Sequence, residues 1–302
     1  MDFINWAPPP LKNPNTLEGV GLNCETVRFD SFYNASGERL VLPAGQKYKD
    51  RKDRGSKSAL SVTTHWNRDH DFSHTVLDIR SPHMKAALKA TVPEYASFNI
   101  GTKHISISGG PWCLYHYRQE LQKYGQELMG RDHEAATHVY HLLMYMWETF
   151  SLEILTLSIW AENPEEPPAL DHKNLWMVYR PGDIVFVRER RLAFLLTKMT
   201  LDGRNWKLNG HYIDFDGSEY GSRRIDVFIN AYDGFKLLRG LAATPFGRLP
   251  ESEQEAMRKD LVARGRKFIA LHGKQYLWYD GKFKSWFGGS YTMVRFFLSA
   301  SA

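Results

Sequence analysis

The sequence has few of the features that mark secreted or membrane proteins. Its 302 residues contain only two cysteines, Cys24 and Cys113, so a disulfide framework is excluded and reduced thiols are expected. No apolar run reaches the roughly 20 residues that a membrane-spanning helix needs. The N-terminus, MDFINWAPPP, lacks the basic and apolar stretches of a signal peptide. We therefore expect an intracellular protein, cytoplasmic or nuclear, that has no membrane partner.

The short motifs of nucleotide and ester chemistry are also absent. No GxxxxGK[ST], GxGxxG or GxSxG segment occurs, so neither a phosphate-binding loop nor a nucleophile elbow is predicted. A catalytic triad from distant residues stays open, because its members need not be close in sequence. From the residues alone we predict no catalytic group, no cofactor, no metal and no ATP hydrolysis by this chain.

Histidine spacing argues against a zinc site. His133 and His138 are five residues apart, or about 140° around a helix, whereas the H-E-x-x-H motif needs a separation of four. His138 and His141 are three apart and can share a helix face. No third ligand is implied, so these are interpreted as helix-surface histidines.

Two acidic segments resemble cation sites only in part. The segment HWNRDHDFSH contains His65, His70 and His74 together with two aspartates, a set that suits a divalent metal, but it is better interpreted as a polar loop. The segment DFDGSEYG lacks the alternating oxygen ligands of an EF-hand. Its place between two alternating segments predicts a hairpin turn instead.

The pattern along the chain predicts an α+β fold in five parts. Residues 1–74, with three successive prolines and the charged run KYKDRKDRGSKS, are expected to form a partly disordered arm of low order. A mixed, mainly helical subdomain follows over 75–162, in which Ser81 and Pro82 begin a helix. A Pro-rich acidic linker covers 163–174.

Beyond residue 174, apolar and polar residues alternate with a period of two, as in β-strands. Short strand candidates joined by tight turns predict a compact antiparallel β-barrel-like domain over 175–283. It includes one helix over 251–265 and strands at KFIALHG and QYLWYDG. The tail, 284–302, contains the apolar segment YTMVRFFL, which is either an edge strand of the barrel or an exposed, aggregation-prone end.

The segment NLWMVYRPGDIVFV is predicted to be a corner between two strands. Pro181 fixes its own φ, and Gly182 can take a positive φ without a steric penalty. Asp183 is expected to accept a local backbone hydrogen bond, and Arg180 precedes the turn. We interpret these four residues as structural.

Basic side chains are the remaining candidates for a contact site, in a chain of net charge +5. They either meet a phosphate or an acidic partner, or complement the C-terminal end of the helix dipole. The candidates are Arg258, Lys259, Arg264, Arg266 and Lys267 near the predicted helix end, with Arg223 and Arg224 in a strand.

Six segments in order resemble a known family. They are SPHMKAAL, PWCLYHYRQELQKY, HVYHLLMYMWETF, NLWMVYRPGDIVF, GHYIDFDGSEYG, and DLVARGRKF followed by QYLWYDG. Together they resemble the domain of unknown function that precedes the ATPase core in fungal AAA+ proteins, over residues 75–281. The resemblance implies that the motor, with its Walker motifs, lies downstream. This chain continues instead with KFKSWFGGSYTMVRFFLSASA, so we expect it to lack the core, and any ATPase description to be inherited from that core.

Three functions follow as hypotheses. The resemblance favours a non-catalytic recognition or adaptor region that binds protein partners or substrates for the absent motor. The alternative is a nucleic-acid-binding small barrel, in which aromatic side chains stack on bases beside cations. Its ingredients would be Trp206, Tyr212, Phe215 and Tyr220 near Arg204, Lys207, Arg223 and Arg224. An enzyme with a pocket that the sequence does not reveal is the third.

Overall fold

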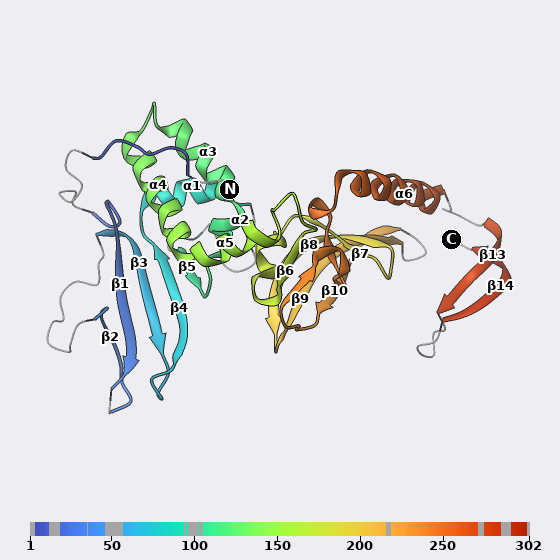
Figure 1. The fold of residues 1–302 in the computed structure, drawn as a ribbon, viewed down its shortest axis with the longest axis horizontal. Helices are drawn as coiled ribbons and strands as arrows, with labels where there is room; N and C mark the ends of the chain where they lie inside the picture. The colour runs from blue at the N-terminus through green and yellow to red at the C-terminus, as the bar shows by residue number, and fades with distance from the viewer. Residues whose placement is uncertain are drawn as a thin grey trace. The chain divides into compact units, whose positions relative to one another are not determined.

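The computed structural model describes an α+β protein that divides into two units (Figure 1). The described residues are 4–11, 19–34, 36–45, 57–93, 95, 102, 105–215 and 219–270, with the backbone strands 275–284 and 291–300. The first unit comprises residues 1–181 and 232–237, and the second comprises 182–231 and 238–302. The change of unit at Pro181–Gly182 lies after the linker that we expected at 163–174.

A five-stranded sheet forms much of the first unit, in the order β2-β1-β3-β4-β5. Its strands are β1 (Asn23–Tyr33), β2 (Arg39–Pro43), β3 (Ser58–Trp66), β4 (Phe72–Ile79) and β5 (Ile105–Ser108). Strands β1 and β3 are parallel, and the other neighbours are antiparallel.

The prediction of a low-order arm over 1–74 is therefore wrong for three whole strands and the start of β4. Most side chains of β1 are half-buried rather than strictly alternating between core and solvent, so the period-two signal is weak. The parallel partner of β1 begins 25 residues after β1 ends, at Ser58. Pairing over that distance leaves no local hairpin signal in the sequence. Of the charged run at 47–58, residues 47–56 lie outside the described residues.

Five helices complete the first unit. They are α1 (Pro82–Thr91), α2 (Trp112–His116), α3 (Arg118–Leu128), α4 (His133–Thr149) and α5 (Ser151–Trp160). The predicted start of α1 is confirmed, since the Ser81 hydroxyl accepts from the Met84 N–H and Pro82 follows it. Helices α1, α3 and α4 pack against one another.

The two long helices that the sequence suggested are each broken once. The first breaks at Tyr117, between α2 and α3. The second breaks at Phe150, where α4 and α5 are bent by 70°. Within the described residues no single helix is long and apolar enough to cross a membrane, and only this bent pair passes that test together, by length and composition alone.

The segment NLWMV is a 3₁₀ helix and not a strand, which corrects the sequence prediction. It forms η1 (His172–Val178), between β6 (Ala169–Asp171) and the turn at Pro181. Leu175, Trp176, Met177 and Val178 are all buried, so the run has no exposed face to show a period. The Trp176 ring stacks on Trp112 at 5.3 Å and meets Phe150 at 4.9 Å. Strand β6 pairs with β11 (Phe235–Leu237).

The second unit is built on an open antiparallel sheet in the order β10-β9-β8-β7-β12. Its strands are β7 (Ile184–Val187), β8 (Leu192–Asp202), β9 (Asn205–Phe215), β10 (Tyr220–Ile229) and β12 (Thr244–Pro245). No barrel closes in the part of the chain that the structure describes, which corrects the barrel prediction. One edge strand has only two residues, one of them a proline, and such a strand cannot extend the hydrogen-bonded ladder.

Short 3₁₀ turns, one helix and a hairpin follow the sheet. These are η2 (Leu238–Gly240), η3 (Phe246–Arg248), α6 (Glu251–Ala270), β13 (Gln275–Lys284) and β14 (Tyr291–Ala300). Helix α6 runs five residues past the predicted end, so Lys267–Ala270 are helical where we expected a strand. Strand β14 pairs with β13 over its whole length, so the YTMVRFFL segment is not an edge of the larger sheet.

Candidate functional site

The turn predicted at Arg180–Asp183 is held by side chains of the first unit. The Arg180 guanidinium donates to the Glu120 carboxylate at 2.6 Å and lies 4.1 Å from the centre of the Tyr117 ring. The Tyr117 hydroxyl donates to the carbonyl of Pro181 at 3.4 Å. Gly182 has a φ of +97°, a conformation that glycine adopts without strain. The sequence predicted the positive φ of Gly182. It did not show that Arg180 contacts Glu120 and Tyr117.

Asp183 and Gly182 connect the turn to the second unit's sheet through backbone groups. The Gly182 N–H donates to the carbonyl of Leu196 at 2.7 Å, and the Asp183 carbonyl accepts from the Leu196 N–H at 2.9 Å. These two bonds are cross-strand backbone bonds, and they differ from the local hydrogen bond that we expected Asp183 to accept at the turn. These bonds continue the pairing of β7 with β8, so the turn joins the hydrogen-bonded ladder of that sheet.

The candidate cations on α6 are all exposed, and two of them hold the helix in place. The Arg258 guanidinium lies 5.6 Å from the Phe246 ring centre. Arg264 donates to the Arg191 carbonyl, and the Arg191 side chain donates in turn to Asp260 at 2.8 Å. These contacts indicate that Arg258 and Arg264 help to pack α6 against its neighbours. Three other cations are exposed along the same helix: Lys259, Arg266 and Lys267.

Arg223 and Arg224 do not form one cationic patch. They are consecutive in β10, and consecutive side chains of a strand project from opposite faces. Arg223 donates to Asp214 at 2.7 Å, and that hydrogen bond holds the pKa of the Asp214 carboxyl below its ordinary value. The pair therefore offers less free positive charge than the sequence suggests.

The aromatic residues considered for base stacking are used in packing. Trp206 is only 2% exposed, and the Tyr212 hydroxyl donates to Asp214 at 3.3 Å. Tyr220 contacts the rings of Phe215 and Phe268, at centroid distances of 4.9 and 5.5 Å. Such contacts are typical of the side chains that join a sheet to its covering helix.

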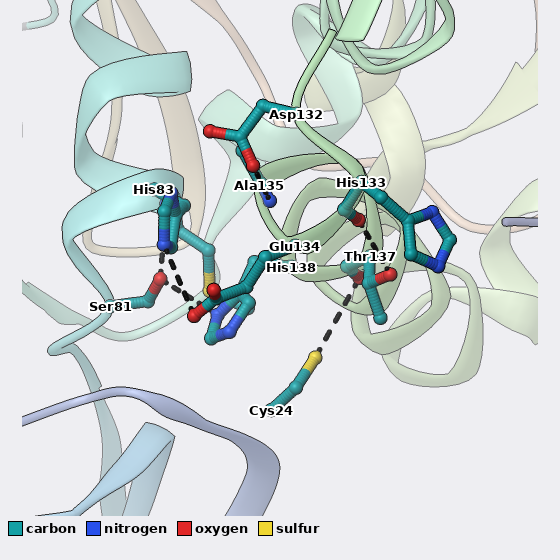
Figure 2. A network of polar contacts seen from close by, with 10 residues as sticks. Cys24, Ser81, His83, Asp132, His133, Glu134, Ala135, Thr137 and His138 are labelled. Atoms are coloured by element: carbon teal, nitrogen blue, oxygen red, sulfur yellow. Dashed lines mark hydrogen bonds and ion pairs between the residues drawn. The ribbon is translucent and has the colours of Figure 1, made fainter. Parts of the chain in front are cut away.

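A polar network between α1, α4 and β1 has the residue types of a nucleophilic site (Figure 2). The Ser81 oxygen lies 2.8 Å from His138 Nδ1 and also accepts from the Met84 N–H at 3.2 Å. Burial lowers the pKa of His138 to about 4, so its imidazole is neutral at pH 7.

This network is structural in its geometry. Ser81 and His138 are both 0% exposed, and a nucleophile must reach its substrate. His83 lies 3.6 Å from Glu134, and Cys24 donates to the Thr137 carbonyl at 3.7 Å. Burial, and then the Glu134 charge, raise the pKa of the Cys24 thiol to about 12. The group connects three elements and presents no reactive thiolate or exposed hydroxyl.

Metal ligation finds no support in the positions of the histidines. Nowhere in the described ranges do three or more His, Cys, Asp or Glu side chains come together to hold an ion. His65 and His74 are cross-strand partners whose rings stack at 4.6 Å. His70 lies in the turn between them with a φ of +62°, and the Asn67 side chain accepts from the backbone of both nearby aspartates. This segment is a capped hairpin turn.

An exposed apolar face on α5 is the feature that the sequence did not reveal. Leu152, Leu155, Ile159 and Trp160 are 75, 47, 50 and 45% exposed, while Ile154 and Leu157 are buried on the opposite face. In the sequence, the first two leucines continue the apolar face of α4. The 70° bend at Phe150 turns them outward, and that bend has no glycine or proline signal.

This apolar face extends beyond the helix. The Trp160 ring stacks on Phe235 of β11 at 4.3 Å, and Phe235 and Leu237 are also exposed. Exposed carboxylates flank α5 in sequence. They are Glu148 before the helix and Glu162, Glu165 and Glu166 after it. We call Leu152, Leu155, Ile159, Trp160 and Phe235 the α5 face.

Comparison with known proteins adds a family match over part of the chain. Residues 161–250 match a family described as a domain of unknown function (DUF7025). The matched stretch includes η1, the turn at Pro181 and the sheet of the second unit. No curated protein and no solved structure matches the chain.

Proposed function

We propose that this chain is a non-catalytic adaptor that binds a protein partner through the α5 face. Leu152, Leu155 and Ile159, spaced at three and four residues on one helix, form a stripe, and Trp160 lies about 100° around the helix from Ile159. Single exposed apolar residues are ordinary, but a helix that is apolar on both faces is normally covered on both. The α5 face is the observation that carries this proposal.

The chemistry of the surroundings indicates what the partner offers. Covering apolar area favours association, offset in part by the freedom lost on binding, and Trp160 supplies the large aromatic anchor that is typical of binding hot spots. The exposed Glu165 and Glu166 favour a partner with basic residues around its apolar contacts, since complementary charge speeds association and excludes competitors. The polar residues that might have served catalysis, Ser81, His138 and Cys24, are used in packing.

A double substitution tests the proposal. Leu152→Glu with Ile159→Glu places two charges on the stripe, and both side chains are largely exposed, so the fold should lose less than about 0.5 kcal/mol per site. Quantitative crosslinking in extracts should show specific partners lost from the double variant. Ile213→Glu, at an exposed position of β9 in the other unit, is the matched control. If the unchanged chain, the double variant and Ile213→Glu crosslink to the same partners, the α5 face is not the binding surface.

We further propose that the chain corresponds to the region that precedes the ATPase core in fungal AAA+ proteins, and that it acts inside the cell. The order of the six motifs supports the first statement, and the match at 161–250 overlaps two of them. Both cysteines are free thiols, as expected in a reducing compartment. In that setting the adaptor would present partners or substrates to the motor. A Walker A motif in the reading frame beyond Ala302 would support this assignment, and an unrelated domain there would argue against it.

Single-stranded nucleic acid is the alternative ligand, and it is less favoured. Lys207 and Arg223 are ion-paired with Asp226 and Asp214, at 2.9 and 2.7 Å. A groove that tracks a phosphate backbone needs cations that are not neutralised in this way. Binding of a labelled oligonucleotide that weakens steeply with salt, and that is lost on Arg223→Ala with Arg224→Ala, would favour nucleic acid over protein.

A further inference from the structure

The N-terminal segment, residues 4–11, lies against α3 and α4 through one tryptophan. The Trp6 ring meets the Tyr140 ring edge-on at 5.6 Å. It also covers Gly125, where an added Cβ would lie 2.6 Å from Trp6 Cη2 and 3.0 Å from Val139 Cγ1. Glycine is unfavourable inside a helix, and here its missing Cβ provides the space that the indole fills. Gly125 and Val139 thus form a notch for an aromatic side chain.

Two glutamines beside the notch bind the preceding residue. Gln122 and Gln126 are one turn apart on α3, and each donates from Nε2 to the Asn5 side-chain oxygen at 2.9 Å. Two amide donors converging on one oxygen suit an asparagine, and suit an aspartate better, because hydrogen bonds to a charged acceptor are stronger. The notch and the glutamine pair together recognise Asn-Trp or Asp-Trp.

Residues 4–11 occupy this site with few hydrogen bonds. Trp6 Nε1 is buried without a hydrogen-bond acceptor, which disfavours the bound state. Among the residues that the structure describes, segment 4–11 makes its hydrogen bonds only through the exposed Asn5 side chain. Pro8, Pro9 and Pro10 have no N–H to donate, and they favour an extended chain that loses little entropy on binding. The recognising groups belong to well-ordered helices, whereas the occupant adds no secondary structure.

We propose that the Gly125 notch and the Gln122–Gln126 pair are a docking site for an extended segment of a partner protein, in which tryptophan follows Asn or Asp. Residues 4–11 occupy this site in cis as a replaceable ligand. A partner segment that also offers an acceptor to the indole N–H would have an advantage over the cis segment. The site uses residues separate from the α5 face, so it stands or falls independently of the adaptor proposal.

A peptide-exchange experiment tests this site in the full chain. The probe is a fluorescein-labelled peptide with the sequence of residues 2–11, DFINWAPPPL, and the readout is fluorescence anisotropy. Trp6→Ala empties the notch, so this variant should bind the probe at least tenfold more tightly than the unchanged chain does. A probe with alanine in place of tryptophan should not bind. A probe with aspartate in place of asparagine should bind several-fold more tightly.

The receptor side is tested by two glycine variants in the Trp6→Ala background. Gly125→Ala fills the notch and should weaken probe binding at least tenfold. Gly130→Ala is the matched control, because an added Cβ there meets nothing within 4 Å, and it should leave binding unchanged. If Gly125→Ala disturbs the fold, Gln122→Glu with Gln126→Glu replaces two donors by acceptors on the helix surface and should cause a similar loss.

Three results would overturn the proposal. One is equal binding of the probe to the unchanged chain and to Trp6→Ala. Another is binding that is insensitive both to Gly125→Ala and to the glutamine pair. The third is a dimer of the unchanged chain in sedimentation equilibrium that dissociates in Trp6→Ala, because the occupant in trans would then be a second copy of this chain.

Discussion

The Arg180 guanidinium and the Glu120 carboxylate meet at 2.6 Å, with the arginine lying over the Tyr117 ring. Both charged side chains are about one-third exposed, so solvent screens the pair in part. The planar guanidinium satisfies two demands at once, since it donates to a carboxylate and stacks on an aromatic face. This contact attaches the turn before β7 to α3.

Removing Arg180 should destabilise the first unit. Arg180→Ala leaves the Glu120 carboxylate, one oxygen of which is buried without a partner, and it also removes the stacking on Tyr117. We expect a loss of about 1–3 kcal/mol in the free energy of unfolding, measured by urea denaturation. Arg180→Lys should recover only part of it, because lysine lacks the planar group.

A double-mutant cycle with Glu120→Gln then separates the ion pair from the stacking. A coupling energy below about 0.5 kcal/mol would show that the pair itself contributes little. Arg224→Ala, at an exposed position of β10, is the control and should change stability by less than about 0.5 kcal/mol.

Mild acid should weaken the fold through two buried histidines. Burial lowers the pKa values of His116 and His138 to about 4, against 6.5 for an ordinary imidazole. Well above pH 6.5 both are neutral whether the chain is folded or unfolded. Between pH 6.5 and 4 only the unfolded chain takes up these protons, so the free energy of unfolding falls by up to ~3 kcal/mol per histidine.

His116→Gln isolates one of these contributions. His116 Nε2 lies 2.8 Å from the Trp176 carbonyl, and Nδ1 lies 3.0 Å from the Tyr95 hydroxyl. Glutamine retains an N–H donor and does not titrate. The variant should be less stable at pH 7, but its stability should fall less between pH 6.5 and 4. Identical slopes for the variant and the unchanged chain would contradict the prediction.

Two helix caps should differ in strength. Ser81 accepts from the Met84 N–H and also contacts His138, whereas Asp132 accepts from the Ala135 N–H. Loss of a cap alone costs about 0.5–2 kcal/mol. Ser81→Ala should cost more than Asp132→Ala, because it also leaves a buried His138 nitrogen without its hydroxyl partner. Thermal unfolding of both variants checks the order, and an equal loss would show that the contact to His138 contributes nothing.

Both thiols should be unreactive in the folded protein. Burial raises the pKa values of Cys24 and Cys113 to about 12, and only the thiolate is a good nucleophile. Ellman's reagent at pH 8 should therefore label neither cysteine quickly in the native state, and should label both after denaturation. Rapid labelling of Cys24 in the native protein would contradict its assignment to the packed network.

Local signals in the sequence predicted local structure well. The Ser81–Pro82 pair marks the start of α1, and Gly203, with a φ of +62°, lies at the turn between β8 and β9. The α+β class followed from a change of period along the chain. In each case the residue type and the backbone conformation are linked within a few positions, so no knowledge of distant partners is needed.

Features that depend on distant partners were missed. Strand β1 is defined by its pairing with β3, and η1 by the aromatic rings that surround Trp176. The outward direction of Leu152 depends on the bend at Phe150. Gly125 is an isolated glycine in a helical pattern, which costs helix stability relative to alanine. The sequence could not show that it is covered by Trp6, 119 positions earlier.

The chain passes from the first unit into the second after Pro181. It returns to the first unit for residues 232–237 and then continues in the second unit. A gene fragment that ends at Pro181 would encode β6 without β11, and Trp160 without the Phe235 ring on which it stacks. The family match at 161–250 also begins and ends inside these units. The segment that is recognisable by sequence therefore coincides with neither structural unit.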